Sequence, residues 1–229
     1  MSTPAEQMAA RIEARLAGRV TRRESLPADL SYDVPAADLV AVATTLRDEA
    51  ELRFEMLIDL AGIDYLHHGR DEWRTVSASS SGFGRAVNRM GRGGVHDGPR
   101  FAVICQLLSV THNERLTLRV FCPDNEEPVL DSLVSVYPSA NWFEREAFDL
   151  FGIVFNNHPD LRRLLTDYGF IGHPFRKDFP LIGNVEVRYD ADKQRVVYVP
   201  VEIVSRTLVP RVIRDDHRYD PELKDQPRG

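Results

Sequence analysis

Apolar residues recur at intervals of three and four in two stretches near the start of the chain. The first stretch runs from Ala5 to Leu16 and stops before Gly18, and the second follows Pro35 and runs to about Glu49. This spacing predicts two surface helices, each with one apolar face. Gly18 is expected to be the C-cap of the first helix, and Pro35 suits the first turn of the second.

A different pattern, apolar over short runs or alternating with polar residues, is typical of β-strands. It occurs in residues 52–60, 100–110 and 115–123, and the polar turn THNE joins the last two into a predicted antiparallel hairpin. Two further stretches, residues 19–25 and 30–34, are expected to be short paired strands between the helices. The three longer strands are expected to form the core of the protein.

After Pro138 the helical period returns in the sequence SANWFEREAFDLFG. Ser139 is the candidate N-cap of this helix, and Gly152 is expected to end it. The apolar stripe of the helix consists of Ala140, Phe143, Ala147 and Leu150. A buried helix fits this stripe.

Three other segments lack a core-forming pattern or follow the main run of elements. Residues 67–99 are rich in Gly, Ser and Arg without a sustained period, which predicts a long flexible insertion. Residues 185–209 hold two strand-like runs around the turn ADKQ and predict a second hairpin. Residues 210–229 carry five acids and five bases with little apolar surface, and such an arm cannot fold alone.

These elements predict an α+β fold: a mixed or antiparallel sheet with helices packed on it, followed by an irregular docking segment and an extended C-terminal arm. The expected boundaries are 1–155 for the domain, including the insertion, 156–184 for the irregular segment, 185–209 for the hairpin and 210–229 for the arm.

Composition narrows the classes of function. The net charge of −6 and the pI near 5.7 argue against general nucleic-acid binding, which needs an electropositive surface. No apolar run is long enough to span a bilayer, and no secretory signal is evident, so we expect a cytoplasmic location. Cys105 and Cys122 lie in strand-like runs and are expected to be buried free thiols rather than a disulfide. Two thiols cannot supply the four ligands of an iron–sulfur cluster.

The helix that begins near Ser139 carries most of the candidate chemistry. Arg145 lies between Glu144 and Glu146 and four residues before Asp149, a spacing that predicts an Arg145–Asp149 ion pair. Paired carboxylates can act as general acid and base, but a structural charge network is the favoured interpretation. The cations expected to complete that network are Arg162, Arg163, Arg176 and Lys177.

Two histidines precede prolines, which restrict the residue before them to extended conformations. His158 and His173 could bind a metal, but no helical pair of ligands occurs in the sequence. The favoured interpretation is that both hold loops in place through hydrogen bonds. The glycine-rich run GFGRAVNRMGRGG could likewise cradle a phosphate or contact RNA, but it follows no strand-to-helix turn, and a solvated loop fits it better.

Residues 135–181, SVYPSANWFEREAFDLFGIVFNNHPDLRRLLTDYGFIGHPFRKDFPL, resemble the signature region of a subunit family of respiratory NADH:quinone oxidoreductase (complex I), the 30-kilodalton family, which is designated C. The motifs Glu-Arg-Glu, His-Pro-Asp-Leu-Arg-Arg and Gly-His-Pro-x-Arg-Lys-Asp-Phe-Pro-Leu stand in the order and spacing of that family. Weaker similarity also covers the strands from Leu52 to Pro123. The sequence departs from the family at Cys105 and Phe148, where tyrosine is frequent, and in its longer insertion.

The resemblance implies a structural subunit that has no flavin, cluster or catalytic residue of its own. It implies a place in the peripheral arm, on the cytoplasmic side of a bacterial inner membrane. Its implied neighbours are subunits D, B and I, of which D is the 49-kilodalton docking partner and B and I carry clusters. That complex passes electrons from NADH through FMN and iron–sulfur clusters to quinone and couples this to proton translocation.

The same resemblance marks the residues expected to shape the interface. They are Trp142, Glu144, Arg145, Glu146, Asp149, Phe151, Gly152, His158, Asp160, Arg162, Arg163, Tyr168, Gly172, His173, Arg176, Lys177 and Asp178.

Two other functions remain open from the residues alone. A free-standing hydrolase would use Glu146, Asp149 and His158 and would show activity without a partner. An RNA-binding module would use residues 82–94, so deleting them would separate that function from scaffolding.

Overall fold

The computed structural model describes residues 3–24, 29–66, 68 and 98–202, together with the backbone of two strands within residues 67–97. The chain divides into two compact units. One unit is made of Met1–Leu66 and Gly98–Phe179, and the other of His67–Asp97 and Pro180–Gly229. The predicted arm of residues 210–229 lies outside the described residues.

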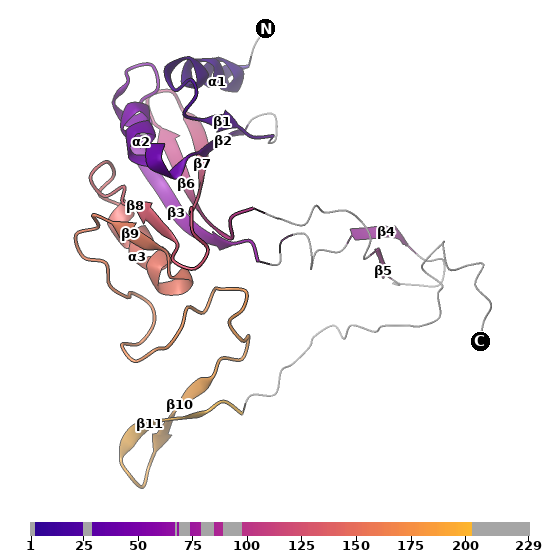
Figure 1. Cartoon of the computed structure of the whole chain (residues 1–229), viewed down its shortest axis with the longest axis vertical. Coiled ribbons are helices and arrows are strands. Elements are labelled where there is room, and N and C mark those ends of the chain that lie inside the picture. Colours follow the sequence, from indigo (N-terminus) through magenta and orange to yellow (C-terminus); the bar gives the residue numbers. More distant parts are fainter. Residues whose placement is uncertain are drawn as a thin grey trace, which may run out of the picture. The chain divides into compact units, whose positions relative to one another are not determined.

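The first unit is built on a five-stranded sheet in the order β1, β2, β7, β6 and β3 (Figure 1). Strands β2 and β7 are parallel, and all other neighbours are antiparallel. The strands are β1 (Thr21–Arg22), β2 (Leu30–Val34), β3 (Met56–Asp64), β6 (Phe101–Ser109) and β7 (Glu114–Phe121).

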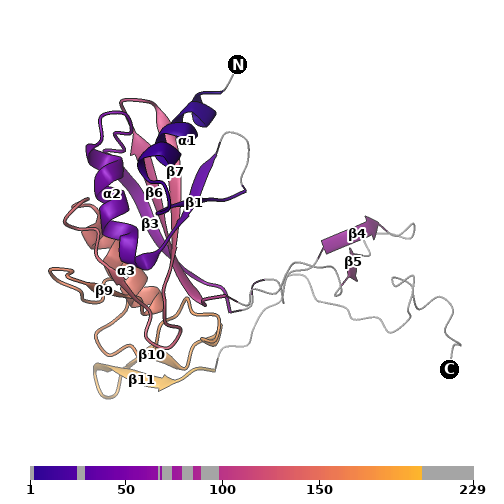
Figure 2. The same ribbon diagram turned by 45° about the horizontal axis from the view of Figure 1, so that its top comes forward.

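Two helices, α1 (Pro4–Arg15) and α2 (Leu39–Asp48), lie along one face of the sheet in both views (Figures 1 and 2). A short 3₁₀ turn, η1 (Ala36–Asp38), leads into α2. The third helix, α3 (Ala140–Phe151), lies beside the edge strand β3 and next to a small parallel pair, β8 (Val129–Asp131) and β9 (Val154–Asn156). The predicted α+β fold class is confirmed.

The core follows the predicted patterns closely. The helical stripes are buried, as Met8 and Ile12 of α1 and Leu46 of α2 show, and β6 alternates between buried and half-buried residues after three buried ones. Cys105 and Cys122 are buried and unpaired, as predicted, and burial raises the pKa of each thiol to about 12. Thiols with such pKa values stay protonated and unreactive at neutral pH.

The predicted helix ends were less accurate than the helices. α1 ends at Arg15 with Leu16 as its C-cap, so the assignment of Gly18 as the cap was wrong; Gly18 adopts a φ of +80° in the turn that follows. Pro35 precedes η1 instead of lying within the first turn of α2. The capping box formed by Thr3 and Glu6 was not predicted. Apolar spacing gives the period of a helix but says little about its last turn.

Ser139 occupies the N-cap position of α3 but caps no backbone N–H group. Its backbone is in the helical region instead of the extended conformation that a capping side chain needs. Its hydroxyl donates to the carbonyl of Leu57, 3.4 Å away, which joins the start of α3 to strand β3. The predicted capping role was therefore wrong, whereas the predicted end at Gly152, with φ of +74°, is confirmed.

The predicted strand pairs are present, with one shifted boundary. β6 and β7 form the predicted hairpin, from Ala102 opposite Phe121 to Ser109 opposite Glu114. β1 and β2 are also paired as predicted. β3 begins at Met56, four residues after the predicted start, because a turn with Arg53 at φ 45° follows α2. The parallel pairs β2–β7 and β8–β9 were not predicted.

The second unit contains the predicted C-terminal hairpin, β10 (Val185–Asp190) and β11 (Arg195–Pro200), which pair antiparallel without a register shift. Within the predicted insertion the backbone forms a strand pair, β4 (Arg74–Ala78) and β5 (Arg85–Asn88), that the sequence pattern did not predict. The rest of the glycine-rich run lies outside the described residues. No described helix has the length and hydropathy that crossing a bilayer requires.

Candidate docking site

Residues 157–179, called the signature segment here, bind back onto the C-terminal half of α3. The amide of Phe175 donates to the carbonyl of Leu150 at 3.0 Å, and Arg176 Nε donates to the carbonyl of Phe151 at 2.6 Å. These bonds use carbonyls at the last turn of the helix that have no partner within it. The signature segment therefore supplies hydrogen-bond donors to the last carbonyls of α3, and the helix in turn fixes the path of the segment.

Asp149 organises the first half of this contact. Its side chain is fully buried and accepts five hydrogen bonds: from the amides of Leu164, Leu165 and Thr166, from Thr166 Oγ1, and from Arg163 Nη1 at 3.0 Å. Burial alone would raise the pKa of this carboxyl, but the hydrogen bonds from Thr166 and its neighbours outweigh it and hold the pKa well below its ordinary range. An ionised Asp149 thus anchors the turn of residues 163–166.

The predicted ion pair between Arg145 and Asp149 was wrong. Arg145 donates instead to the carbonyls of Arg162 and Arg163, at 3.1 and 3.2 Å, and it lies over the ring of Trp142. A spacing of four favours such a pair on a solvated helix. Here the signature segment supplies the donors that bind the Asp149 carboxylate. It also supplies the carbonyl acceptors that bind the Arg145 guanidinium. Of the cations predicted to neutralise the helix acids, Arg163 fills that role.

Glu144 lies one turn earlier on α3 and is also fully buried. Its carboxyl accepts from Ser132 Oγ at 2.6 Å and from the amide of Leu133 at 2.7 Å, and His158 Nε2 lies 3.9 Å away. Burial raises the pKa of Glu144 to about 7, because these two hydrogen bonds offset only part of the desolvation. The sequence did not predict Ser132 as a partner, because it lies in the connection before the helix.

Both histidines hold loops, as predicted. His158 Nδ1 accepts from the amide of Asp160 at 3.0 Å, so its Nε2 carries the proton and donates to the carbonyl of Asn141 at 3.1 Å. His173 Nδ1 lies 2.8 Å from the carbonyl of Asp149. Burial lowers the pKa of His173, which favours the neutral imidazole. In the described residues no group of three or more candidate side chains is arranged to hold a metal ion.

The second half of the signature segment is fixed at the ends of strands β3 and β6. Arg100 binds the buried Asp64 at 2.7 Å and Asp178 at 3.0 Å, and the amide of Lys177 donates to Asp64 at 2.9 Å. Lys177 therefore contributes its backbone here, whereas its predicted role was as a cation. Asp64 and Arg100 were not predicted as site residues. The signal for them was the presence of opposite charges at the paired ends of two neighbouring strands.

Arg176 lies over the ring of Phe101, with its guanidinium carbon 4.9 Å from the ring centre. Arg100 lies over the same ring at 4.6 Å. Burial lowers the pKa of Arg176, and the charge of Arg100 lowers it further. The cation is held by an aromatic face and the carbonyl of Phe151.

Gly152 allows the segment to approach the end of α3. A Cβ atom at this position would lie 2.6 Å from both Arg176 Nη2 and His173 Nε2. Gly172 also has a positive φ, 96°, and its carbonyl accepts from Arg163 Nη2 at 3.0 Å. Phe151 packs edge to face with Phe175, at 5.8 Å between ring centres. The predicted glycine and aromatic residues thus shape the path of the chain.

Around this fixed frame several large apolar side chains are exposed. Tyr168 is fully exposed and Ile171 is 88% exposed, although both belong to a segment whose backbone is held in place. The others are Trp142, Leu165 and Phe175. Asp160 and Arg162 form an exposed ion pair of 2.8 Å. A rigid segment that presents large apolar residues to solvent is suited to binding another polypeptide.

The hydrolase alternative finds little support in the geometry. None of the interactions in the described parts of the chain joins any two of Glu146, Asp149 and His158. Asp149 is held ionised by five donors, which does not suit a group that must exchange a proton near neutral pH.

Comparison with known proteins agrees with the resemblance found in the sequence. Residues 32–185 match the model of the family described as respiratory-chain NADH dehydrogenase, 30 Kd subunit. The NADH-quinone oxidoreductase subunit designated C of Halorhodospira halophila is 55% identical over 227 residues, covering 93% of this chain and 92% of that relative. The protein of the same name from Burkholderia multivorans is 52% identical over 219 residues, covering 96% and 98%.

A solved structure shares the fold at low identity. A chain of the membrane-bound sulfane sulfur reductase, an archaeal respiratory membrane complex, superposes with a TM-score of 0.52 at 17% identity, covering 79% of this chain and 88% of that chain. The family model covers well over half of the sequence, and the relatives are similar over nearly their whole length. The chain therefore belongs to the 30-kilodalton subunit family of respiratory-chain NADH dehydrogenase.

Proposed function

We propose that this chain is a non-catalytic scaffold subunit in the peripheral arm of proton-translocating NADH:quinone oxidoreductase. In this role it docks on the 49-kilodalton subunit, near subunits B and I, and keeps electron-transfer distances and the quinone cavity in those chains fixed. FMN and the iron–sulfur clusters belong to other subunits, and this chain binds none of them. The subunit is peripheral, on the cytoplasmic side of the bacterial inner membrane, and associates with the membrane only through the complex.

Family membership supports the complex, and the signature segment supports the docking role. The observation that carries the proposal is the exposure of Tyr168 and Ile171 on a segment whose backbone and charges are held within the chain. Exposed apolar side chains that lie together on a surface mark a site where another molecule binds. Here Asp149 and Arg163 fix the turn that presents them, so little entropy is lost on binding.

The geometry also divides the arginines between two roles. Arg163 and Arg176 direct donors to groups within the chain, so they brace the segment. Arg162 pairs only with the exposed Asp160 among the described residues and is free to meet a carboxylate of a partner. In this proposal the exposed apolar residues are the anchors of the interface and Arg162 belongs to its charged rim. Arg163 and Arg176 support both by holding the segment in place.

The test is recovery of the affinity-tagged chain from bacterial membranes, followed by identification of its companions. We expect the 49-kilodalton subunit and subunits B and I among them. Replacing Arg176 with alanine should lower recovery of the assembled arm by loosening the brace, and Arg162→Ala should lower it by removing a contact at the rim.

The control is Arg15→Ala, which removes a similarly exposed ion pair, with Glu51, on α1. This variant should assemble as the unmodified chain does, because such pairs contribute at most about 1 kcal/mol. Normal assembly of the Arg162 and Arg176 variants with loss of turnover would contradict the scaffold function.

A further inference from the structure

The hairpin of β10 and β11 has one face made entirely of apolar and aromatic residues. In an antiparallel pair, directly opposite residues point to the same side. Three consecutive pairs on one side are Val185 with Pro200, Val187 with Tyr198, and Tyr189 with Val196. Each of these residues is exposed, and Tyr198 is 64% exposed. This set of six residues is called the apolar face of the hairpin.

The opposite face has a different character. Its cross-strand pairs are Glu186 with Val199, Arg188 with Val197, and Asp190 with Arg195. Every pair on this side contains a charged residue. The alternation along each strand is therefore that of a half-buried strand with one solvated side. The second side of such a strand faces a core, and nothing in the described part of the second unit supplies that core.

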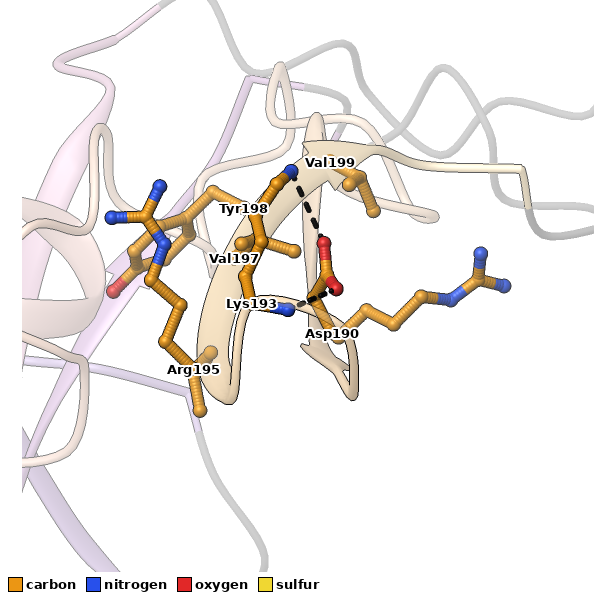
Figure 3. Close-up of a pocket in the computed structure, with 8 residues that line it drawn as sticks. Asp190, Lys193, Arg195, Val197, Tyr198 and Val199 are labelled. Atoms are coloured by element: carbon orange, nitrogen blue, oxygen red, sulfur yellow. Dashed lines mark hydrogen bonds and ion pairs between the residues drawn. The ribbon is translucent and has the colours of Figure 1, made fainter.

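The hairpin is well specified by its own turn. The carboxylate of Asp190 accepts from the amide of Lys193 at 3.0 Å and pairs with its ammonium group at 3.1 Å. Both interactions are drawn in Figure 3, where the two residues lie at the turn end of the hairpin. Gln194 takes a left-handed conformation, φ 51°, that closes the turn. The register is thus fixed, and so is the composition of each face.

A hairpin of this kind is marginal by itself, since two strands in water need a third element against their apolar face. The exposed valines and tyrosines amount to roughly 500 Å² of surface, about two thirds of what one partner contributes to an ordinary stable interface. That area is too small to hold two copies of the chain together. It suits one part of a larger interface with a partner that is bound elsewhere as well.

We infer that the apolar face of the hairpin is a second docking surface, covered by a neighbouring subunit of the same complex. The inference rests on the proposed scaffold function. The occupant presents an apolar strip with hydrogen-bond acceptors at the positions of the Tyr189 and Tyr198 hydroxyls, since buried tyrosines retain a polar partner. The hairpin begins at Val185, six residues after the signature segment ends at Phe179, and six residues of chain span at most about 20 Å, so a partner bound to the segment is within reach of the hairpin.

The test compares two adjacent residues that point to opposite sides of β10. Val187→Glu places a charge on the apolar face, and Arg188→Glu places one on the opposite face. Each variant is made in the full, tagged chain and recovered from membranes. We expect Val187→Glu to lower recovery of the assembled complex at least about tenfold, because an unpaired carboxylate would be buried. Arg188→Glu should stay within about twofold of the unmodified chain.

A second measurement follows the hairpin itself by hydrogen exchange. Its amides should exchange at least about a hundredfold more slowly in the assembled complex than in the free full chain. Both variants should unfold at the same urea concentration as the unmodified free chain, because the substituted side chains are exposed there. Loss of assembly in Val187→Glu then cannot be attributed to misfolding.

Each alternative outcome decides against the inference. Equal recovery of the two variants, whether high or low, would overturn it, as would equal exchange in the free and assembled chain. A dimer of the free chain that Val187→Glu dissociates would assign the face to a second copy. Flotation with phosphatidylglycerol vesicles, lost in the same variant, would assign it to lipid. If the unmodified chain recovers no companions, the scaffold function itself fails.

Discussion

Two carboxyl groups of one helix, Glu144 and Asp149, are equally buried yet have opposite electrostatic character. Burial raises the pKa of Glu144 to about 7, whereas the pKa of Asp149 is held well below its ordinary range. The difference lies in the donors around each group: two for Glu144 and five for Asp149, one of them a cation. Burial sets the cost of a charge, but the local supply of donors decides whether the charge persists.

The two carboxyl groups also serve different parts of the molecule. Glu144 binds the connection at Ser132 and Leu133, which joins α3 to the rest of the first unit. Asp149 binds the turn that presents the exposed residues of the signature segment. The first carboxyl can release or take up a proton near neutral pH, whereas the second stays ionised. Glu144 therefore serves the fold, and Asp149 serves the proposed interface.

Replacing the more strongly bound carboxylate should have the largest effect. Asp149→Asn keeps the shape but removes the charge that Arg163 and the amides of the turn require. We expect a loss of about 4 kcal/mol in the free energy of unfolding at pH 7, measured by urea denaturation of the full chain. Because the folded pKa of Asp149 is lowered, the stability it contributes is present above its unfolded pKa and lost on acidification. The deficit of the variant should thus shrink below about pH 4.

Glu146 provides a matched control for that experiment. It lies on the same helix, is only partly buried, and takes part in none of the hydrogen bonds or ion pairs among the described residues. Glu146→Gln should change stability by less than about 0.5 kcal/mol. Similar losses in both variants would mean that Asp149 has no special place in the fold.

A pH series on Glu144→Gln sharpens the contrast. The folded pKa of Glu144, about 7, lies above its ordinary value of 4.5, so the folded chain holds more protons between those two pH values. Its contribution to stability is complete below the unfolded pKa and falls as the pH rises, by up to about 3 kcal/mol. The amide of the variant cannot ionise, so the stability of the variant should increase relative to that of the unmodified chain as the pH rises over this range. A constant difference between the two stability curves would show that folding leaves the pKa of Glu144 unchanged.

A smaller effect is expected from Gly152→Ala, which perturbs the Asp149 end of α3 without touching either carboxyl. The added Cβ atom would clash with the side chains of Arg176 and His173, and the new alanine would have to adopt a positive φ. We expect a loss of about 2 kcal/mol in unfolding free energy, of which about 1 kcal/mol is backbone strain. Gly18→Ala is the control, since Gly18 also has a positive φ but nothing lies near its Cβ position. Equal losses in both variants would mean that the close approach at Gly152 costs nothing.

The sequence predicted the positions of the helices and strands better than it predicted the contacts between them. Helical and strand spacing located α1, α2, α3 and the two main hairpins, because apolar faces must be buried. The sequence did not predict the parallel pairing of β2 with β7, because such pairing joins chain segments that are far apart in sequence. The roles of His158 and His173 were predicted because a following proline limits the backbone.

The charge network shows where local spacing stops being informative. Arg145 was assigned to Asp149 from helical geometry, but a later segment of the chain brought Arg163 and three amides to the carboxylate. Asp64 and Arg100 escaped notice because the insertion separates them in sequence while the sheet places them together. Local rules thus describe a solvated helix well, and they fail where another part of the chain covers it.

The bond between Asp64 and Arg100 has a consequence for how this chain can vary. The amide of Tyr65 also donates to the carbonyl of Arg100, at 2.8 Å, so the polypeptide leaves and re-enters the sheet at two points that are tied together. Whatever length of chain lies between those points adds only a slowly growing closure entropy. Evolution can lengthen, shorten or exchange that excursion without disturbing the register of β3 and β6.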